Sequence, residues 1–149
     1  MDLVKRDQSK KVPVDKSISG TVLYVEDNDT NWEFTQVALN KSFDLIRASN
    51  STEAFSILEK QDPDFILMDI QLNGSELNGI EITQCIRGIH PENSKWGVDP
   101  KHSSLPIVFI TAYPYTREEI VGFGGDDVIY KPVNLLDLTG SITKIAADK

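Results

Sequence analysis

The chain has 149 residues, of which 40% are hydrophobic and 26% are charged, and this is the composition of one ordinary globular domain. Its net charge of −8 argues against binding nucleic acid or an anionic membrane through a broad electrostatic surface. No apolar run approaches the length of a membrane span, no hydrophobic segment follows the charges at the N-terminus, and the single Cys85 cannot form an internal disulfide. These features are typical of a protein of the reducing cytoplasm.

The first part of the chain differs in charge from the rest. Residues 1–20 carry five Lys or Arg and three Asp, whereas the remainder is strongly acidic. This first part is also poor in aromatic residues and shows no periodicity, so it offers little apolar surface to bury. We therefore expect residues 1–18 to form a flexible tail and residues 19–149 to form one domain.

From residue 20 onward, apolar strand-like runs alternate with helix-like patterns. This alternation is typical of a parallel sheet covered by helices. The first, third and fourth runs are almost entirely apolar, as expected of strands that are covered on both faces. The predicted strands are residues 21–25, 43–48, 65–69, 106–110 and 127–130.

The predicted helices each carry apolar residues at helical spacing. Asn50 is expected to cap the second helix together with Glu53. The last helix is expected to begin at Asn134, with Asp137 in its first turn. The expected apolar faces are Phe34, Val37 and Ala38 in residues 30–40; Ala54, Ile57 and Leu58 in residues 51–60; Ile82, Cys85, Ile86 and Ile89 in the third helix; and Leu135, Leu138, Ile142 and Ile145 in the last.

Two segments are predicted to be less regular. The fourth helix, near residues 116–123, is weak because Gly122, Gly124 and Gly125 raise its backbone entropy and shorten it, and we expect it to be the most mobile element. The stretch 88–104 is rich in Gly, Pro and polar residues, which predicts a long surface loop.

Acidic residues stand at the ends of two apolar strands. Glu26 and Asp27 follow the first strand, and Asp69 closes the third. Because parallel α/β sheets bind ligands at the carboxyl ends of their strands, we expect these carboxylates to meet. Clustered carboxylates raise one another's pKa unless a cation lies among them, and Mg²⁺ prefers such hard oxygen ligands. The pattern predicts metal-assisted phosphoryl chemistry.

Two more motifs end the last two strands. Thr111 and Ala112 offer a hydroxyl and a backbone N–H that could both point at a bound oxyanion, although a Thr here equally predicts a cap for the next turn. Lys131, followed by Pro132, supplies a positive charge. An isolated Lys is usually solvated, so its meaning depends on the other motifs.

The ordered set of motifs resembles the receiver domain of two-component response regulators. The resemblance covers about residues 20–147 and implies a doubly wound α/β fold, in which helices cover both faces of a five-stranded parallel sheet with strand order 2-1-3-4-5. The motifs that carry it, each at the end of a successive apolar strand, are Glu26-Asp27, Asp69, Thr111-Ala112 and Lys131-Pro132.

The resemblance implies a role for each acidic residue. Asp69 would be the phosphoacceptor and would attack the phosphoryl group of a partner's phosphohistidine. Asp27 and Asp69, with the backbone carbonyl of Gln71, would bind Mg²⁺ directly. Glu26 would act through a bound water.

The remaining motifs would hold the phosphoryl group. By the same resemblance, Lys131 would pair with phosphoryl oxygens, and the Thr111 hydroxyl and the Ala112 N–H would hold the others. These roles agree with a loose transition state that is stabilised mainly by positioning and positive charge. The resemblance further implies that the bond between Lys131 and Pro132 is cis.

The implied biology is phosphorelay signalling rather than conventional enzymology. The expected partner is a histidine kinase or a histidine phosphotransfer protein, with no direct contact to nucleic acid or membrane. A homodimer through the fourth helix, fifth strand and fifth helix is a further expectation. Whether the chain is a stand-alone regulator or a piece of a hybrid histidine kinase stays open.

The chain departs from the family pattern in two loops and at one strand position, and the stretch from His90 to Ser104 is longer than usual. The loop from Leu72 to Gly79 is longer than usual and lacks the usual Pro. Val128 stands where an aromatic switch residue is usual, so we expect a muted switch or one carried by other groups, with Tyr130 on the same strand face. Tyr113, two residues beyond Thr111, is expected to slow hydrolysis of the acyl phosphate.

Three alternatives remain at this stage. A haloacid-dehalogenase-like phosphatase also uses an Asp nucleophile with Mg²⁺, but it requires a second Asp where this chain has Gln71. A flavin-binding protein of the same fold is less favoured, since Glu26 and Asp27 would repel its phosphate. A receiver retained only as a docking scaffold is disfavoured by the intact acid, Thr and Lys set, although Val128 and the altered loop support it.

Other conspicuous residues are given structural interpretations. His90 and His102 lie in a polar loop without metal-ligand spacing, so no metal site is expected there. Trp96 is interpreted as a packing anchor, and Cys85 as inert core.

Overall fold

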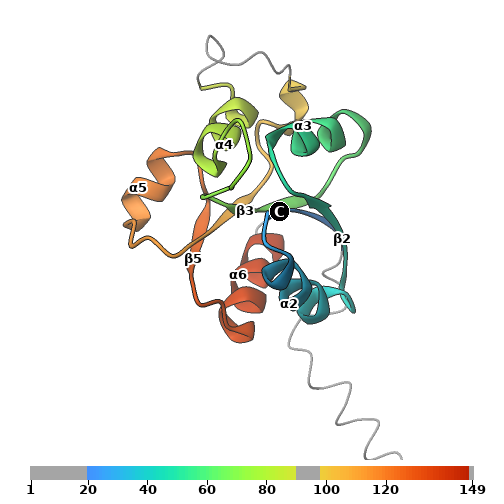
Figure 1. The fold of residues 1–149 in the computed structure, drawn as a ribbon, viewed down its shortest axis with the longest axis vertical. Helices are drawn as coiled ribbons and strands as arrows, with labels where there is room; N and C mark the ends of the chain where they lie inside the picture. Colours follow the sequence, from blue (N-terminus) through green and yellow to red (C-terminus); the bar gives the residue numbers. More distant parts are fainter. Residues whose placement is uncertain (1–19, 90–97, 148–149) are drawn as a thin grey trace, which may run out of the picture.

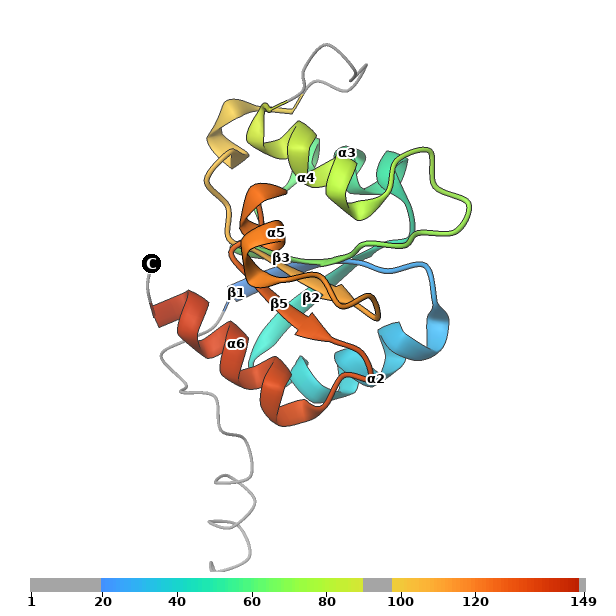
Figure 2. The same ribbon diagram turned by 90° about the vertical axis from the view of Figure 1, so that its left-hand side faces the viewer.

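The computed structural model describes residues 20–89 and 98–147, which form a parallel sheet between two layers of helices (Figures 1 and 2). All neighbouring strands pair in parallel, and their spatial order is β2-β1-β3-β4-β5. The predicted α/β class and strand order are therefore confirmed. The strands are β1 (Gly20–Val25), β2 (Phe43–Ala48), β3 (Phe65–Asp69), β4 (Ile107–Thr111) and β5 (Asp127–Tyr130).

Helices cover both faces of the sheet. One face packs against α3 (Ser51–Lys60), α4 (Gly79–Arg87) and α5 (Arg117–Gly122), and the other packs against α2 (Asp29–Leu39) and α6 (Leu135–Ala147) (Figure 1). A short 3₁₀ helix, η2 (Pro100–His102), precedes β4. Within the two described ranges, no helix is long and apolar enough to cross a membrane. The predicted tail, His90 and Trp96 lie outside the described residues.

Alternation along the strands divides the core into two layers. On β1, Leu23 and Val25 join the cluster beneath α3 and α4, whereas Val22 and Tyr24 join the cluster beneath α2 and α6. Every residue of β3 and β4 is buried, as predicted for strands that are covered on both faces.

The predicted apolar face of α2 was wrong in part. Phe34 and Val37 are 47% and 68% exposed, whereas Thr35 and Leu39 are buried. Trp32, Thr35 and Leu39 recur at helical spacing and face the sheet, so a partly polar stripe takes the place of the more hydrophobic one. Of the three predicted residues, Ala38 packs against the core, so hydrophobicity alone misplaced Phe34 and Val37.

The other helices bury most of the predicted residues. Ala54, Leu58, Ile82, Ile86, Leu138 and Ile142 are buried, and Ile57, Cys85 and Ile145 pack partly against the core. Leu135 is 42% exposed because it is the first residue of α6, and Ile89, which is 46% exposed, lies beyond the end of α4.

Two side chains attach the segment before β4 to the helices. Arg87 donates to the carbonyls of Gly124, Ser103 and Leu105, and pairs with Asp126 at 3.0 Å. His102 is buried, and its Nε2 lies 3.0 Å from the carbonyl oxygen of Leu58 in the last turn of α3. His102 thus has a structural role.

Candidate functional site

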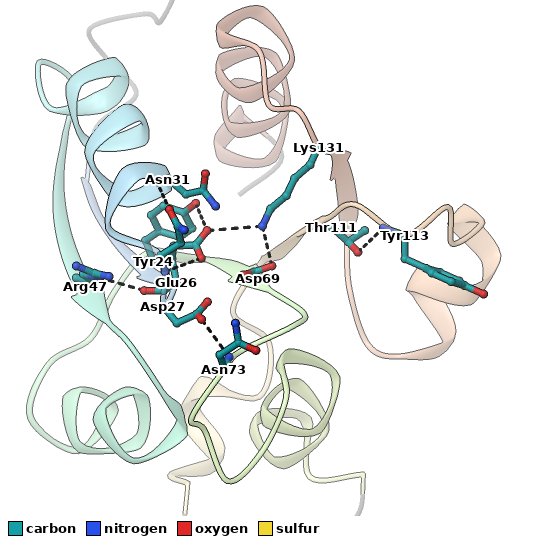
Figure 3. Close-up of polar contacts among 11 residues, drawn as sticks. Tyr24, Glu26, Asp27, Asn31, Arg47, Asp69, Asn73, Thr111, Tyr113 and Lys131 are labelled. Atoms are coloured by element: carbon teal, nitrogen blue, oxygen red, sulfur yellow. Dashed lines mark hydrogen bonds and ion pairs between the residues drawn. The ribbon is translucent and has the colours of Figure 1, made fainter.

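The conspicuous polar residues gather at the carboxyl edge of the sheet (Figure 3). Asp69 is the last residue of β3 and is 3% exposed. Glu26 and Asp27 directly follow β1, the neighbouring strand, and Lys131 directly follows β5. Because the strand order reverses between β1 and β3, the helices diverge there and leave room for a ligand.

Glu26, Asp27 and Asp69 form an acidic cluster. One carboxylate oxygen of each lies within 4.8 Å of the others, and Glu26 is completely buried. Burial, followed by the negative charge of Glu26, raises the pKa of Asp69 to about 7 against the opposing effect of Lys131. The cluster is therefore short of positive charge.

Lys131 lies between two of the acids (Figure 3). Its Nζ is 3.3 Å from Oδ1 of Asp69 and 3.9 Å from Oε1 of Glu26. The bond from Lys131 to Pro132 is cis, as expected from the resemblance. A flexible ammonium in this position can follow a new anion on Asp69.

Glu26 is held by hydrogen bonds on both carboxylate oxygens. The hydroxyl of Tyr24 donates to Oε1 at 3.0 Å, and the Asn28 N–H donates to Oε2 at 3.1 Å. Burial, with the nearby Glu26 charge, raises the pKa of Tyr24 far above its ordinary value, so its hydroxyl keeps the proton that it donates.

Asp27 is held by the loop that follows Asp69. The backbone N–H of Asn73 donates to Oδ2 of Asp27 at 3.1 Å. Asn73 belongs to the lengthened loop that lacks a Pro, and a Pro at this position would have no N–H to give. The departure in sequence thus supplies a hydrogen bond to the acidic cluster.

Thr111 ends β4 and is 2% exposed. Its Oγ1 accepts the backbone N–H of Tyr113 at 3.0 Å, so the Thr has the local capping contact considered from the sequence. Ala112 is the first residue after β4, and Gln71 is the second residue after β3. Both are exposed at the same edge of the sheet.

Aromatic side chains of the loop after β4 pack against one another and against Phe123 at the end of α5. The rings of Tyr113 and Tyr115 are 4.6 Å apart, and Tyr115 meets Phe123 edge to face at 5.2 Å. The hydroxyl of Tyr130 donates to the carbonyl of Tyr115. Figure 3 shows the Tyr113 ring directed away from Asp69. Val128 is 6% exposed and belongs to the core.

The donor set fits a magnesium ion. Three carboxylates at this edge supply hard oxygen atoms, and a cation among them would offset the negative charge of Glu26, which adds to burial in raising the pKa of Asp69. Within residues 20–89 and 98–147, this is the one group of acidic, His or Cys side chains close enough to hold a metal.

The structure brings together the predicted Glu26, Asp27, Asp69 and Lys131, and it adds three residues that the motifs did not indicate. These are Tyr24, Asn73 and Arg47, whose guanidinium reaches the same turn from β2. A Tyr two residues before Glu26 shares its strand face, which is a usable signal for Tyr24. The contacts of Asn73 and Arg47 depend on a loop path and a strand register.

Comparison with known proteins identifies relatives along most of the chain. A family model described as the response regulator receiver domain matches residues 22–143. The polar-differentiation response regulator DivK of Brucella anthropi is 30% identical over 118 residues, which cover 77% of this chain and 86% of DivK. The sensor protein GacS of Pseudomonas syringae pv. syringae is 29% identical over 126 residues, which cover 83% of this chain but 13% of GacS.

Solved structures share the fold. A putative response regulator from Chloroflexus aurantiacus superposes with a TM-score of 0.73 at 26% identity, covering 87% of this chain and 98% of that one. The receiver domain of the sensor histidine kinase PA1611 from Pseudomonas aeruginosa, which has a magnesium ion coordinated in its active-site cleft, superposes with a TM-score of 0.69 at 23% identity, covering 87% and 98%.

Proposed function

This chain belongs to the response regulator receiver domain family of two-component systems, and on that premise we propose that it accepts a phosphoryl group on Asp69. The observation that carries the proposal is the geometry at the sheet edge. Asp69 lies beside two further carboxylates within 4.8 Å and beside the Lys131 ammonium at 3.3 Å. A nucleophile, a cation site and a fixed positive charge are the parts that phosphoryl transfer requires.

In the proposed reaction, a carboxylate oxygen of Asp69 attacks the phosphorus of a phosphohistidine. The new P–O bond forms as the P–N bond breaks, and the histidine nitrogen leaves with the bonding electron pair. Lys131 moves from the Asp69 carboxylate to the phosphoryl oxygens, and the Thr111 hydroxyl and the Ala112 N–H hold the remaining oxygens. These groups act by positioning and by charge.

Receiver domains bind Mg²⁺ in an acidic pocket, and Asp27, Asp69 and the Gln71 carbonyl are the proposed ligands here, with Glu26 acting through a bound water. When bound, the ion neutralises the charge that develops on the transferring group. The hydrogen bonds to Glu26 and Asp27 hold these carboxylates in place before the ion arrives. Two carboxylates and one carbonyl oxygen are a ligand set that suits a single bound Mg²⁺ ion.

The proposed partner is a histidine kinase or a histidine phosphotransfer protein, encountered in the cytoplasm. GacS is itself a sensor protein and DivK a response regulator, and the chain resembles both over similar lengths, so it is proposed as a receiver in either context. Residues 19–149 are proposed as the receiver and residues 1–18 as a tail. A homodimer through α5, β5 and α6 is a further proposal, with no direct contact to nucleic acid or membrane.

The alternatives are not favoured. A haloacid-dehalogenase-like phosphatase would need an acid where Gln71 stands, and the family match covers residues 22–143. A receiver that is only a docking scaffold would not retain Asp69, Lys131 and the acidic cluster in contact distance. Chemical phosphorylation separates a phosphoacceptor from a receiver that is only a docking scaffold.

The first test is incubation with acetyl phosphate and Mg²⁺, followed by intact mass measurement. We expect a gain of one phosphoryl group for the wild type and none for Asp69→Asn. The matched control is Asp44→Asn, because Asp44 is exposed near the opposite end of β2 and should leave the gain intact. A wild type that gains no mass, or a gain that survives in Asp69→Asn, contradicts the assignment.

A further inference from the structure

Arg47 contacts both ends of the turn that carries Asp27, and Figure 3 shows its contact with Glu26. Its Nε donates to the backbone carbonyl of Glu26 at 3.1 Å, and its Nη1 lies 2.8 Å from Oδ1 of Asp29. Asp27 and Asn28 lie between these two contacts. A single guanidinium therefore fixes the peptide before Asp27 and the first residue of α2 after it.

The fold fixes the guanidinium in its place. Arg47 stands on β2 directly opposite Tyr24 of β1 in the strand register, and its side chain is 23% exposed. The guanidinium carbon lies 5.8 Å from the ring centre of Trp32, whose ring is 5.9 Å from that of Tyr24. A cation–π contact with an aromatic ring helps to orient a planar guanidinium and leaves its edge free to donate hydrogen bonds.

Arg47 is one of several contacts that hold this turn, beside the Glu26 N–H, which donates to the Ala48 carbonyl at 2.9 Å, and the Asn28 side chain, which caps α2. The Glu26 side chain is held by Tyr24 and by the Asn28 N–H, and Asp27 is held through its carboxylate by Asn73. The backbone carbonyl of Glu26 and the side-chain carboxylate of Asp29 both contact the guanidinium of Arg47. The Asp29 side chain is 88% exposed, and its backbone belongs to the capped first turn of α2, so the ion pair joins Arg47 to the start of that helix.

We propose that Arg47 is a positioning residue for the metal ligand Asp27 and that it sets the affinity of the site for Mg²⁺. It acts through the Glu26 carbonyl and the Asp29 carboxylate, and it touches neither the metal nor the phosphoryl group. The inference rests on the proposed function, because it presumes that the acidic cluster binds Mg²⁺.

The positive charge of Arg47 and its geometry have opposite effects on metal binding. A cation near three carboxylates repels Mg²⁺, so loss of the charge alone would tighten binding. Loss of the paired contacts of the guanidinium, from Nε to the Glu26 carbonyl and from Nη1 to Asp29, would leave the turn less well fixed and would weaken Mg²⁺ binding. Arg47→Lys keeps the charge and removes the planar guanidinium with its paired contacts, whereas Arg47→Gln removes both the charge and these contacts. If geometry dominates, both variants bind Mg²⁺ more weakly.

The test is calorimetric titration of the whole chain with Mg²⁺ alone. We expect the dissociation constant to rise by about tenfold in Arg47→Lys and Arg47→Gln, the scale typical of residues that orient metal ligands. The matched control is Arg117→Lys, because Arg117 at the start of α5 forms an ion pair with Asp127 at the start of β5, away from the cluster. That variant should bind Mg²⁺ as the wild type does.

A second measurement distinguishes positioning from a general loss of structure. In the acetyl phosphate reaction, the Mg²⁺ concentration that gives half the maximal rate should rise with the dissociation constant, while the rate at saturating Mg²⁺ stays within about twofold of wild type. A loss of structure would lower the saturating rate as well. Should Arg47→Gln fail to fold, Arg47→Lys, which keeps a cation beside Trp32, carries the comparison.

The titration distinguishes a failure of the proposed function from a failure of the proposed role of Arg47. A wild type that binds no Mg²⁺ contradicts the proposed function. A wild type that binds Mg²⁺, together with an unchanged affinity in Arg47→Lys or a tighter affinity in Arg47→Gln, contradicts only the role of Arg47.

Discussion

At the scale of single residues, Tyr113 links the site to the loop beyond it. Its N–H donates to the Thr111 hydroxyl, and its ring lies tilted against Tyr115 and points away from Asp69. If Thr111 moves toward a phosphoryl group, the hydrogen bond carries the backbone of Tyr113 with it. The role of its ring in shielding the acyl phosphate stays a prediction that depends on this movement.

We expect Tyr113→Ala to shorten the lifetime of the acyl phosphate several-fold, because the smaller side chain admits the attacking water. Tyr113→Phe is the matched control, since it keeps the ring and should keep the wild-type lifetime. The measurement is the decay of the phosphorylated mass after the phosphodonor is removed. An unchanged lifetime in Tyr113→Ala would rule out shielding by this ring.

At the scale of elements, α4 begins in direct contact with the strand that carries Asp69. The Gly79 N–H donates to the Ile70 carbonyl at 2.8 Å. A Cβ at Gly79 would lie 2.1 Å from the backbone oxygen of Asp69 and 2.8 Å from Cα of Ile70. Neither atom can rotate away, so α4 can approach β3 this closely only with Gly at its first position.

Gly79→Ala should lower the free energy of unfolding by about 2 kcal/mol or more through this overpacking. The same substitution in the middle of α6, Gly140→Ala, meets no atom within 4 Å and should raise it by up to about 1 kcal/mol through helix propensity. Urea unfolding of both variants measures the difference. Equal effects would show that α4 adjusts without cost.

Sequence patterns predicted the structure best where a single physical requirement determines the residue types. Continuous apolar runs located β3 and β4 because strands covered on both faces need them, and the acids at strand ends followed from parallel topology. The buried face of α2 could not be predicted, because a stripe through Thr35 is only partly apolar. The contacts of Asn73 and Arg47 depend on distant segments, which periodicity does not describe.

At the scale of the whole molecule, Asp127 connects α5, β5 and α6. Burial alone would raise its pKa, but hydrogen bonds from the Ser141 hydroxyl and the Val128 N–H, together with Arg117, lower the pKa of Asp127 below its ordinary value. A carboxyl group with a lowered pKa in the folded protein adds stability above its unfolded pKa of about 3.9, and this contribution is lost as the pH falls through the folded value.

Asp127→Asn should therefore destabilise the protein at neutral pH, and its difference from wild type should shrink as the pH is lowered below about 4. Urea unfolding of both proteins across that range measures the difference. A gap that stays constant with pH would contradict a stabilising charge at Asp127. Asp44→Asn, at an exposed position, is the reference for a carboxyl group without these partners.

The hydrogen bond at Thr111 has a consequence for how a signal leaves the site. The hydroxyl uses an acceptor lone pair on the Tyr113 N–H, so its own proton stays available to a phosphoryl oxygen, and one atom can hold both partners at once. Val128 is locked in the core, while the Tyr130 hydroxyl holds the far side of the same loop at the Tyr115 carbonyl. We therefore predict that a movement of Thr111 reaches the loop that Tyr130 holds through the backbone of Tyr113, without the rotation of an aromatic side chain on β5.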